Sequence, residues 1–492
     1  MLRKILESTL IMGSSSVLVM AMDLIRVKIC AVILGPQGVG ALSILNQFHV
    51  VALTITSLGL GTGIIRYVAT FESEGDPISV QLLVGSAFRI VFIVASAAFI
   101  LCFLLSPYLS HWILGDKRYF VFIIIYALSL PLAAYPMIAG NLLGGLKKIK
   151  SLAKINIYRS IISLLFIIPI VYFHRLKGAV FAVLVITSVH LILAYYYLTK
   201  EQRLFEIFRF QTFNSDLLKK LFPYGVVSLL TGTTYYLSHL LLKMIIVHQL
   251  GMEMNGIYQP IWALTMAYPA LILTSMSAYS YPRICELKTD KEIVDELNGI
   301  VRITTLLVVP TMFLLILARK PVIQMLYSDD FLAASQYLPL QAMGDFFRVL
   351  VWSIGMYLLP TMRLRAFIWL SILHDILLII LAIVFVRSYQ LHGIVTGFTL
   401  CYIITFLVYY WHSKKSISFR FWRKNLNLIF TSFLSLVALV LVCWQFDLML
   451  SYVINIIIIL MWGCLSIKKE EVNKLKIYLY QKFAKQTARV EN

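Results

Sequence analysis

Apolar runs of roughly 20 residues recur along this chain, and they constrain its fold more than any other feature. A helix needs about 20 apolar residues to cross the hydrocarbon core of a bilayer, and a spanning segment must satisfy its backbone hydrogen bonds internally. Charged residues make up 13% of the sequence, whereas roughly 25% is usual for soluble domains. The sequence therefore predicts an all-α polytopic membrane protein.

The run that begins after MLRK superficially resembles a secretory signal peptide. It is too long, carries charges and lacks a small-residue cleavage site before a soluble domain, so we interpret it as an uncleaved first span. In all we expect about fourteen spans, with ends defined to within a few residues. The expected spans are residues 9–34, 41–65, 82–105, 119–143, 155–174, 178–198, 222–248, 256–282, 299–318, 337–360, 367–387, 393–411, 428–446 and 450–467.

Positive charge is distributed unevenly between the expected loops. The net charge of +20 would by itself be compatible with binding to nucleic acid. However, of the 43 Lys and Arg residues, about 30 fall in alternate loops and about 7 in the loops between them, which is the positive-inside pattern of membrane proteins. This asymmetry predicts that both termini are cytoplasmic, and it removes the reason to expect a nucleic-acid partner.

Three charged residues, Asp23, Arg26 and Lys28, interrupt the first span. A charge at the bilayer centre costs about 2.5–3.5 kcal/mol on insertion scales, and ionisable residues inside spans are by default functional. Asp23 and Arg26 are i,i+3 neighbours on one helical face, so they either neutralise each other within the bundle or act on a substrate. Lys28 points away from Asp23 and lies close enough to Gly35 to snorkel to the interface.

A weak internal repeat divides the first twelve spans into two halves. Three patterns recur in order at a spacing of about 210 residues. They are Leu34-Gly35-x4-Gly40 with Leu250-Gly251-x4-Gly256, Pro107 and Asp116 with Pro321 and Asp330, and Leu130-Pro131-Leu132 with Leu338-Pro339-Leu340. Six spans per repeat keep the halves parallel, and transporters of this design bind substrate between them. We therefore expect an N-lobe at 1–200, a C-lobe at 201–412, two further spans at 413–467 and a basic cytoplasmic tail at 468–492.

The repeat spacing places His239 and Lys243 of the seventh span at about the depth of Asp23 and its neighbours in the first. His239 and Lys243 lie i,i+4 on one face, so each half carries an ionisable pair in its first span. If the pair lines a cavity, it is available to a substrate. The alternative is structural, with Lys243 snorkelling outward and His239 hydrogen-bonded in the core.

Further ionisable residues lie in spans 3, 10 and 11. Asp345 and Arg348 form another i,i+3 pair in span 10, Asp375 lies in span 11 about 12 Å from its cytoplasmic end at about 1.5 Å per residue, and Arg89 has an intermediate depth in span 3. Each of these acids either exchanges a proton or sodium ion during transport or only hydrogen-bonds a neighbouring helix. Our candidates for ion exchange are Asp23, Asp345, Asp375 and His239.

Other polar and small residues give weaker signals. Glycines 59–63 follow no strand, so close helix packing is the better interpretation than a nucleotide site. The six cysteines form no C-x-x-C pattern and predict neither a disulfide framework nor a metal site. Residues 203–213 and the tail after 468 are expected to lie on the membrane surface. Side chains able to hydrogen-bond sugars are Asn46, Gln47, Asn141, Tyr235, Gln259 and Trp262.

Four segments resemble a known family: LGPQGVGALSILNQF, GLGTGIIRYVATF, GIYQPIWAL with YPRICELKTDKE, and LPLQAMGDFFRV. They are similar to Wzx-type flippases of lipid-linked oligosaccharides, in the O-antigen and enterobacterial-common-antigen branch of the multidrug/oligosaccharidyl-lipid/polysaccharide (MOP) exporter superfamily. The resemblance covers about residues 1–412. It implies a bacterial inner-membrane protein with two six-helix lobes around a cationic cavity. It also implies that undecaprenyl-diphosphate-linked oligosaccharide is moved to the periplasmic leaflet by alternating access. The buried carboxylates make a proton or sodium ion the candidate coupling ion, and we expect no cofactor.

The charged residues of the spans fit such a substrate. Arg and Lys in a water-filled cavity offset the desolvation of a diphosphate, and Arg can hold phosphate bidentately. We expect Arg26 to contact the diphosphate with support from Lys243, and the further candidates are Lys28, Arg348 and Arg89. Membrane lipids surround such a protein, and glycan polymerases and chain-length regulators are candidate protein partners.

One departure concerns the two last spans, because many members of this branch stop after twelve. The extra pair resembles the additional helices of lipid II flippases, which form a groove for the lipid tail. Residues 428–467 therefore either line such a groove or only add packing.

Two competing functions remain. A cation-coupled drug or metabolite antiporter of the same superfamily is disfavoured because the spans are rich in cations and poor in acids. A membrane-embedded glycan polymerase or ligase is disfavoured because the outward loops are short, the longest being about residues 319–336, and carry no convincing nucleophile or acid–base pair.

Overall fold

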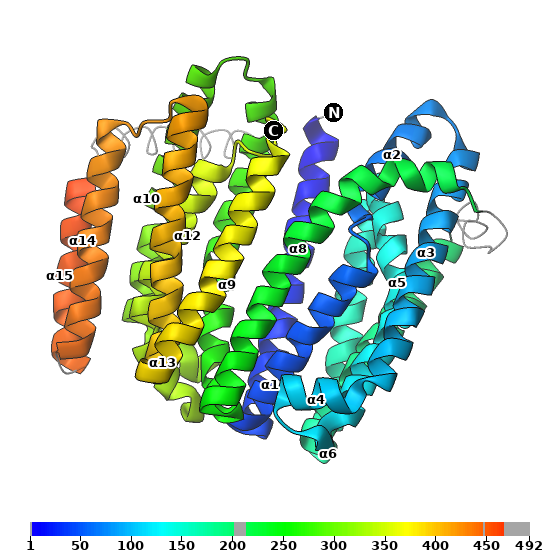
Figure 1. The fold of residues 1–492 in the computed structure, drawn as a ribbon, viewed down its shortest axis with the longest axis horizontal. Helices are drawn as coiled ribbons and strands as arrows, with labels where there is room; N and C mark the ends of the chain where they lie inside the picture. The colour runs from blue at the N-terminus through cyan, green and yellow to red at the C-terminus, as the bar shows by residue number, and fades with distance from the viewer. Residues whose placement is uncertain (1, 201–212, 446–447, 467–492) are drawn as a thin grey trace, which may run out of the picture. The chain divides into compact units, whose positions relative to one another are not determined.

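The computed structural model describes residues 2–200, 213–445 and 448–466, and nearly all of these are helical (Figure 1). The elements are α1 (Leu2–Thr56), α2 (Gly61–Glu74), α3 (Pro77–Leu104), α4 (Ser106–Leu114), η1 (Lys117–Tyr119), α5 (Phe120–Gly145), α6 (Ile149–Thr199), α8 (Ser215–Leu250), α9 (Met252–Glu286), α10 (Asp290–Leu317), α11 (Arg319–Leu326), η3 (Asp329–Gln336), α12 (Leu338–Gly355), α13 (Leu364–Ile417), α14 (Arg423–Gln445) and α15 (Leu448–Ser466). These ranges contain no strand, so the prediction of an all-α protein is confirmed for them.

Apart from the second, each expected span falls largely on one helix or on one half of a kinked helix. Six of the described helices are long and apolar enough to cross a membrane, or seven if the bent α9 is counted as one span. Two of the six, α6 and α13, contain 51 and 54 residues. Each is long enough for two spans, because a helix rises about 1.5 Å per residue.

Local sequence signals explain several helix ends. Pro77 is the first residue of α3, and the Asp76 side chain accepts a hydrogen bond from the Ser79 N–H at 3.0 Å. Thr289 and Glu292 form a reciprocal capping box at the start of α10. Hydrogen bonds from Thr289 hold the pKa of the Glu292 carboxyl below its usual value.

The second expected span, 41–65, is not one continuous helix. Helix α1 is kinked at Gly35, and its second half ends at Thr56. Helix α2 begins at Gly61 after a turn in which Leu58 and Gly59 both have positive φ. A Cβ atom at Gly59 would overlap the carbonyl oxygen of Gly225 in α8. The break therefore lets two backbones meet closely, which is the close packing expected of these glycines.

The backbone repeats itself at nearly the spacing seen in the sequence. Helix α6 is kinked at Arg175 (φ 47°, ψ −128°), and α13 is kinked at Gln390 with almost the same angles (φ 50°, ψ −131°). Positive φ also recurs at Lys147 and Met362, with values of 56° and 58°. Because non-glycine residues rarely adopt these angles, their recurrence supports an internal repeat independently of the sequence motifs.

A glycine follows each of these two kinks, and both glycines pack in the same way. A Cβ atom at Gly178 would overlap the carbonyl oxygen of Ile170, and one at Gly393 would overlap that of Phe385. Only a residue without a side chain allows the two halves of each kinked helix to approach so closely. The corner between spans 5 and 6 is therefore built in the same way as the corner between spans 11 and 12.

The described chain separates into two compact units. The first contains Met1–Pro260, Ile323–Ala333 and Ile368–Ile394, and the second contains Ile261–Val322, Ala334–Phe367 and Val395–Asn492. The boundaries fall inside α9, α11, η3 and α13, so both units contain segments distant in sequence. The lobes expected at 1–200 and 201–412 stay a prediction.

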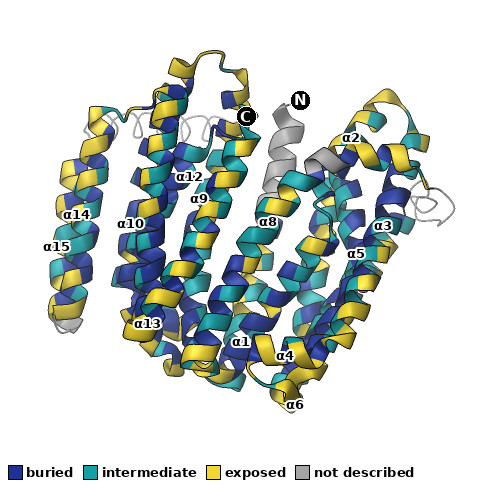
Figure 2. Ribbon diagram, in the orientation of Figure 1, coloured by how far each residue is buried: buried dark blue, intermediate teal, exposed yellow. Residues whose placement is uncertain are grey.

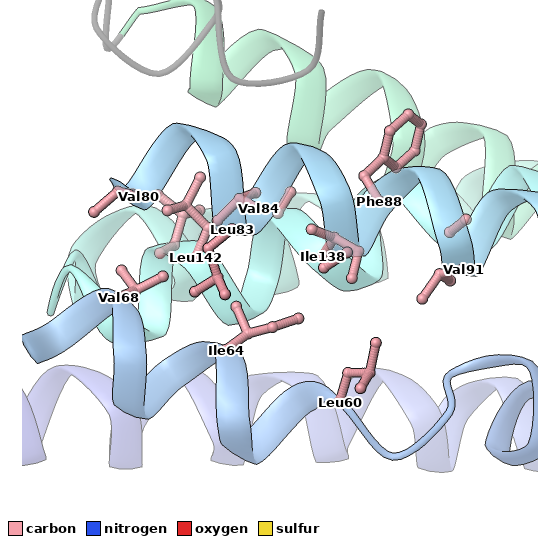
Figure 3. Packing of buried hydrophobic residues seen from close by; sticks show 14 of the residues in the cluster. Leu60, Ile64, Val68, Val80, Leu83, Val84, Phe88, Val91, Ile138 and Leu142 are labelled. Atoms are coloured by element: carbon pink, nitrogen blue, oxygen red, sulfur yellow. The ribbon is translucent and has the colours of Figure 1, made fainter. Parts of the chain in front are cut away.

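The first unit has a core built largely from α2, α3 and α5. Ile64 of α2, Leu83 of α3 and Ile138 of α5 are each 0% exposed and point toward one another (Figure 3). Burying a Leu or Ile side chain contributes about 1.5–3 kcal/mol. A second core cluster joins the second half of α1 to α5 and α8 through Ile44, Ile123 and Leu240.

In the second unit α10 contains many fully buried residues (Figure 2). Its Asn298 is fully buried and holds the linker after α13, because its Nδ2 donates to the carbonyl oxygen of Arg420 at 3.0 Å and its Oδ1 accepts from the N–H of Trp422 at 2.8 Å. Trp462 of α15 donates to the hydroxyl of Ser432 in α14 at 2.9 Å and packs edge-on against Phe313 of α10. The two last expected spans are thus packed on α10.

Two expectations fall outside the described residues. They are the surface segment at 203–213, except for Phe213, and the basic tail after 468.

Candidate substrate-binding cavity

The first unit contains a cavity of about 340 Å³ that is lined from α1, α5, α6 and α9 and by Tyr327, which follows α11. Its polar lining comes from Arg26, Ser43, Asn46, His49 and Gln259, together with the hydroxyl-bearing side chains of Tyr126 and Tyr327. The remaining wall is Val27, Cys30, Val39, Leu42, Val50, Ile167, Val171, Ala179, Ala182, Val183 and Ile186. One cation and several neutral polar groups therefore face an otherwise apolar space, as in many small-molecule sites.

The single cation of this lining is Arg26. Its Nη2 lies 3.0 Å from Oδ1 of Asp23, and the two side chains remain 37% and 46% exposed. The i,i+3 spacing of α1 places both on one face, as the sequence indicated. Because both groups stay accessible, a bound anion can replace Asp23 as the partner of Arg26 without burying an unpaired charge.

Two hydrogen bonds connect α1 to α5 beside Arg26. The hydroxyl of Tyr126 donates to Oδ1 of Asn46 at 2.9 Å, and the hydroxyl of Ser129 lies 2.7 Å from Nε2 of His49. Asn46 and His49 are three residues apart on α1, and Tyr126 and Ser129 are three residues apart on α5. The two hydrogen-bonded pairs therefore form two successive rungs between these helices. The ring of Tyr126 also packs edge-on against His49, with centroids 5.5 Å apart.

Lys243 of α8 lies directly behind this lining. Its side chain is 3% exposed, and its Nζ donates to Oε1 of Gln259 at 2.8 Å and to the carbonyl oxygen of Ser43 at 3.3 Å. Gln259 and Ser43 both line the cavity, whereas Lys243 does not. The structure therefore brings Lys243 close to the Arg26 cavity, with Gln259 in between.

Ser238 of α8 contacts both His239, its neighbour in sequence, and Asp375 of α13. Ser238 donates to Oδ1 of Asp375 at 3.2 Å, and its hydroxyl lies 3.3 Å from Nδ1 of His239. The same Nδ1 lies 2.7 Å from the carbonyl oxygen of Tyr235. Asp375 is 4% exposed, so this carboxyl group is buried, and within the described ranges it forms no ion pair.

In the second unit Asp345 and Arg348 form the pair expected from their spacing. Nη2 of Arg348 lies 3.3 Å from Oδ1 of Asp345, whose side chain is 0% exposed. The hydroxyl of Tyr268 donates to Oδ2 of Asp345 at 2.9 Å. Arg348 also donates to the carbonyl oxygen of Thr265. This pair is thus more deeply buried and more fully bonded than Arg26 and Asp23.

The two remaining candidate cations lie away from the cavity lining. Nζ of Lys28 donates to the carbonyl oxygen of Gln324 at 2.7 Å, near the C-terminal end of α11, where a cation is favoured. The guanidinium of Arg89 stacks over the ring of Phe213 at 5.8 Å. Arg89 lies near the middle of α3, and Phe213 lies just before the start of α8. The Arg89 side chain therefore reaches toward the end of α8 that is expected to face the cytoplasm.

Sequence reasoning identified Arg26, Asn46 and Gln259 but missed His49, Tyr126 and Ser129. The residues of each rung are 80 positions apart, and a single sequence contains no signal for such a pairing. The i,i+3 recurrence of polar groups inside two apolar spans was the one available hint.

Comparison with known proteins identifies the family of this chain. A family model described as polysaccharide biosynthesis protein matches residues 29–336. The chain belongs to this family. It is also 23% identical over 423 residues to the lipid III flippase of Escherichia coli (strain K12), covering 85% of this chain and 99% of that protein.

Two solved structures have the same fold. One is an inward-facing MATE multidrug resistance transporter of the MOP superfamily, with a TM-score of 0.67, 15% identity, and coverage of 81% of this chain and 94% of that chain. The other is the lipid II flippase MurJ in an inward closed conformation, with a TM-score of 0.64, 16% identity, and coverage of 93% and 98%. The MOP-like membrane fold inferred from the sequence is confirmed, and the named relatives are transporters and flippases rather than enzymes.

Proposed function

We propose that this protein is a flippase that moves an undecaprenyl-diphosphate-linked oligosaccharide, of the O-antigen or a similar type, to the outer leaflet of a bacterial inner membrane by alternating access. The observation that carries this proposal is the cavity in which Arg26 is the single cation among neutral polar and apolar side chains. The extent of the similarity to a lipid III flippase supports the same substrate class. Both termini are proposed to be cytoplasmic, from the distribution of Lys and Arg.

Arg26 is the proposed contact of the diphosphate. A lipid diphosphate must lose water to enter the cavity, and a planar guanidinium replaces that water with two parallel charge-assisted hydrogen bonds. Asp23 balances Arg26 in the empty cavity, and the diphosphate takes its place when substrate enters. Arg89 is proposed to meet the head group at the cytoplasmic entrance, and Lys28 and Arg348 to contribute positive potential along its path.

Asp375 is the proposed ion-exchanging group, ahead of Asp23, Asp345 and His239. Its carboxyl group is buried and accepts a hydrogen bond from Ser238, whereas Asp345 already has Arg348 and Tyr268 as partners. A buried carboxylate without a cationic partner is favoured to take up a proton or sodium ion. Movement of that ion would then supply the energy for transport.

The drug-antiporter alternative fits the fold but not the cavity. A cationic drug would meet Arg26, and Asp23, the nearest acid, is already paired with it. A glycan polymerase or ligase has no support from the relatives. Complementation of strains that each lack one known flippase distinguishes these functions, since an antiporter restores no glycan display. Polymerases and chain-length regulators remain proposed partners.

The decisive experiment compares Arg26 variants at matched expression in such a complemented strain. We expect flipping activity to fall in the order wild type, Arg26→Lys, Arg26→Ala, because a lysine keeps the charge but loses the bidentate geometry. Arg26→Ala also leaves Asp23 unpaired, so Asp23→Asn is combined with it to separate stability from binding. A double variant with full expression and full transport would show that the pair is structural and that the diphosphate binds elsewhere.

A further inference from the structure

The ammonium group of Lys243 sits where it can orient a neighbour but cannot itself reach a ligand. Its side chain is 3% exposed, is not part of the cavity lining, and bonds Oε1 of Gln259 and the carbonyl oxygen of Ser43. A ligand in the cavity therefore meets Gln259 first.

This contact settles which way the Gln259 amide points. An ammonium group has three donors and no acceptor, so the amide atom 2.8 Å from Nζ must be the oxygen. The amide nitrogen is then at the opposite corner of the same planar group. In the described part of the chain this nitrogen has no hydrogen-bond partner and is not fully buried, and Gln259 lines the cavity. Its two N–H donors thus face the cavity.

The neighbouring polar groups present donors as well. Arg26 has only donors. Asn46 accepts the Tyr126 hydroxyl on its Oδ1 at 2.9 Å, which leaves its Nδ2 available. A wall of N–H donors with few acceptors suits a ligand rich in oxygen acceptors, and an oxyanion best of all.

We propose that Gln259 is a direct hydrogen-bond donor to the oxyanion of the substrate and that Lys243 is its positioning residue. Lys243 acts by holding Oε1 away from the cavity, so the donors are preorganised before the diphosphate arrives. Without Lys243, the free amide turns its oxygen to the wet cavity. Binding an anion then forces the oxygen back against an apolar neighbour. This inference rests on the proposed function, since it takes a diphosphate as the ligand.

The test is a double-mutant cycle on the purified full-length protein, with farnesyl diphosphate as the probe and its Kd measured calorimetrically. We expect Gln259→Leu and Lys243→Met each to weaken binding at least about tenfold, which is the lower end of the range for one hydrogen bond to a charged group. In the Gln259→Leu background, Lys243→Met should weaken binding no further. Lys243→Arg should restore most of the affinity, because it also donates to Oε1. Lys219→Met, on an exposed residue of the same helix paired with Asp216, is the matched control for loss of one positive charge.

A second variant keeps the fold while reversing the chemistry. Gln259→Glu gives Lys243 a carboxylate partner, so thermal stability should equal or exceed that of the wild type. The same change puts an oxygen in place of the cavity-facing donors, so farnesyl diphosphate should bind at least about thirtyfold more weakly. Loss of affinity at full stability is a result that a purely structural role of Gln259 would not produce.

The outcomes separate this inference from the proposed function. If Lys243→Met and Gln259→Leu weaken binding additively, Lys243 acts on the ligand by its own charge and the positioning role is wrong. If both variants bind as the wild type does while Arg26→Ala does not, the diphosphate site stands and the roles of Gln259 and Lys243 fall. If the wild type fails to bind, or if Arg26→Ala binds normally, the proposed site and this inference fall together.

Discussion

Removal of Asp345 should destabilise the second unit more than any other single change to its charged residues. We consider Asp345→Leu, which replaces the carboxylate with an apolar side chain of larger volume. The change removes the carboxylate that lies 3.3 Å from Arg348 and that accepts from the hydroxyl of Tyr268 at 2.9 Å. Arg348 is only 14% exposed and stays protonated in proteins. Neither hydration nor loss of a proton can therefore relieve the cost of its buried charge.

The geometry sets the magnitude. At a separation of 3.3 Å and an effective dielectric constant of about 20, two unit charges attract by about 5 kcal/mol before desolvation is subtracted. Removing one partner of a buried pair typically costs about 3–5 kcal/mol, because the other charge remains buried. We therefore expect Asp345→Leu to lose about 3–5 kcal/mol of unfolding free energy. Arg348→Leu should lose less, because the remaining carboxyl group can take up a proton.

The assay is the free energy of unfolding of purified protein in a membrane mimetic, alongside transport at matched expression. The double variant Asp345→Leu, Arg348→Leu should recover most of the stability, since no charge is then left buried. If the double variant is as unstable as Asp345→Leu, the ion pair is not the source of the loss. A stable double variant that transports normally removes Asp345 from the ion-exchange candidates.

Two further predictions concern topology and coupling. Reporter tags after Lys414 and at Asn492 should report cytoplasm, and one near Gly251 should report periplasm; a periplasmic C-terminus would mean that the number of spans is odd. Asp375→Asn should slow transport with little loss of folded protein, because Ser238 can still donate to the amide oxygen; a variant that transports normally across external pH and sodium concentration would dismiss Asp375 as the coupling residue.

The fold was largely predictable because periodic apolar runs are a strong signal in membrane proteins. The sequence did not predict the interruption of the second span, because the backbone contact that requires it, between Gly59 and Gly225, joins distant residues. Glycine identities hinted at close packing but not at a positive φ on Leu58. Tertiary contact, not local propensity, decided the geometry there.

The candidate site was predictable only in part. Arg26 and Asp23 could be paired from helical spacing alone, and the i,i+3 pair Asp345 and Arg348 likewise. The position of Lys243 behind Gln259 could not, because 16 residues and the corner between two helices separate them. Spacing shows which residues share a helix face, but only the packed structure shows which of them faces the cavity and which lies behind another.

A reciprocal glycine contact provides the last prediction. A Cβ atom at Gly40 would overlap the carbonyl oxygen of Met252, and one at Gly256 would overlap that of Pro36. Gly40 and Gly256 each end one copy of the repeated motif, in which Pro36 and Met252 are equivalent positions. Each glycine therefore contacts, in the other copy, the residue equivalent to the one that its counterpart contacts. Such a contact behaves like a local two-fold interface. Gly40→Ala and Gly256→Ala should each destabilise the protein by about 1–3 kcal/mol, because a backbone must move.

The pair offers a sharper test than either single change. Once one alanine has separated the helices, the second meets less resistance, so the double variant should lose clearly less than the sum of the singles. Gly299→Ala is the matched control, because its added Cβ meets nothing within 4 Å, and replacing a helical glycine there should be neutral or stabilising by up to about 1 kcal/mol. Additive losses at Gly40 and Gly256 would mean that the two glycines are separate contacts, and unequal losses would argue against their equivalence. Equal losses of stability would instead show that the two copies of the motif are equivalent in packing energy, as they are in sequence.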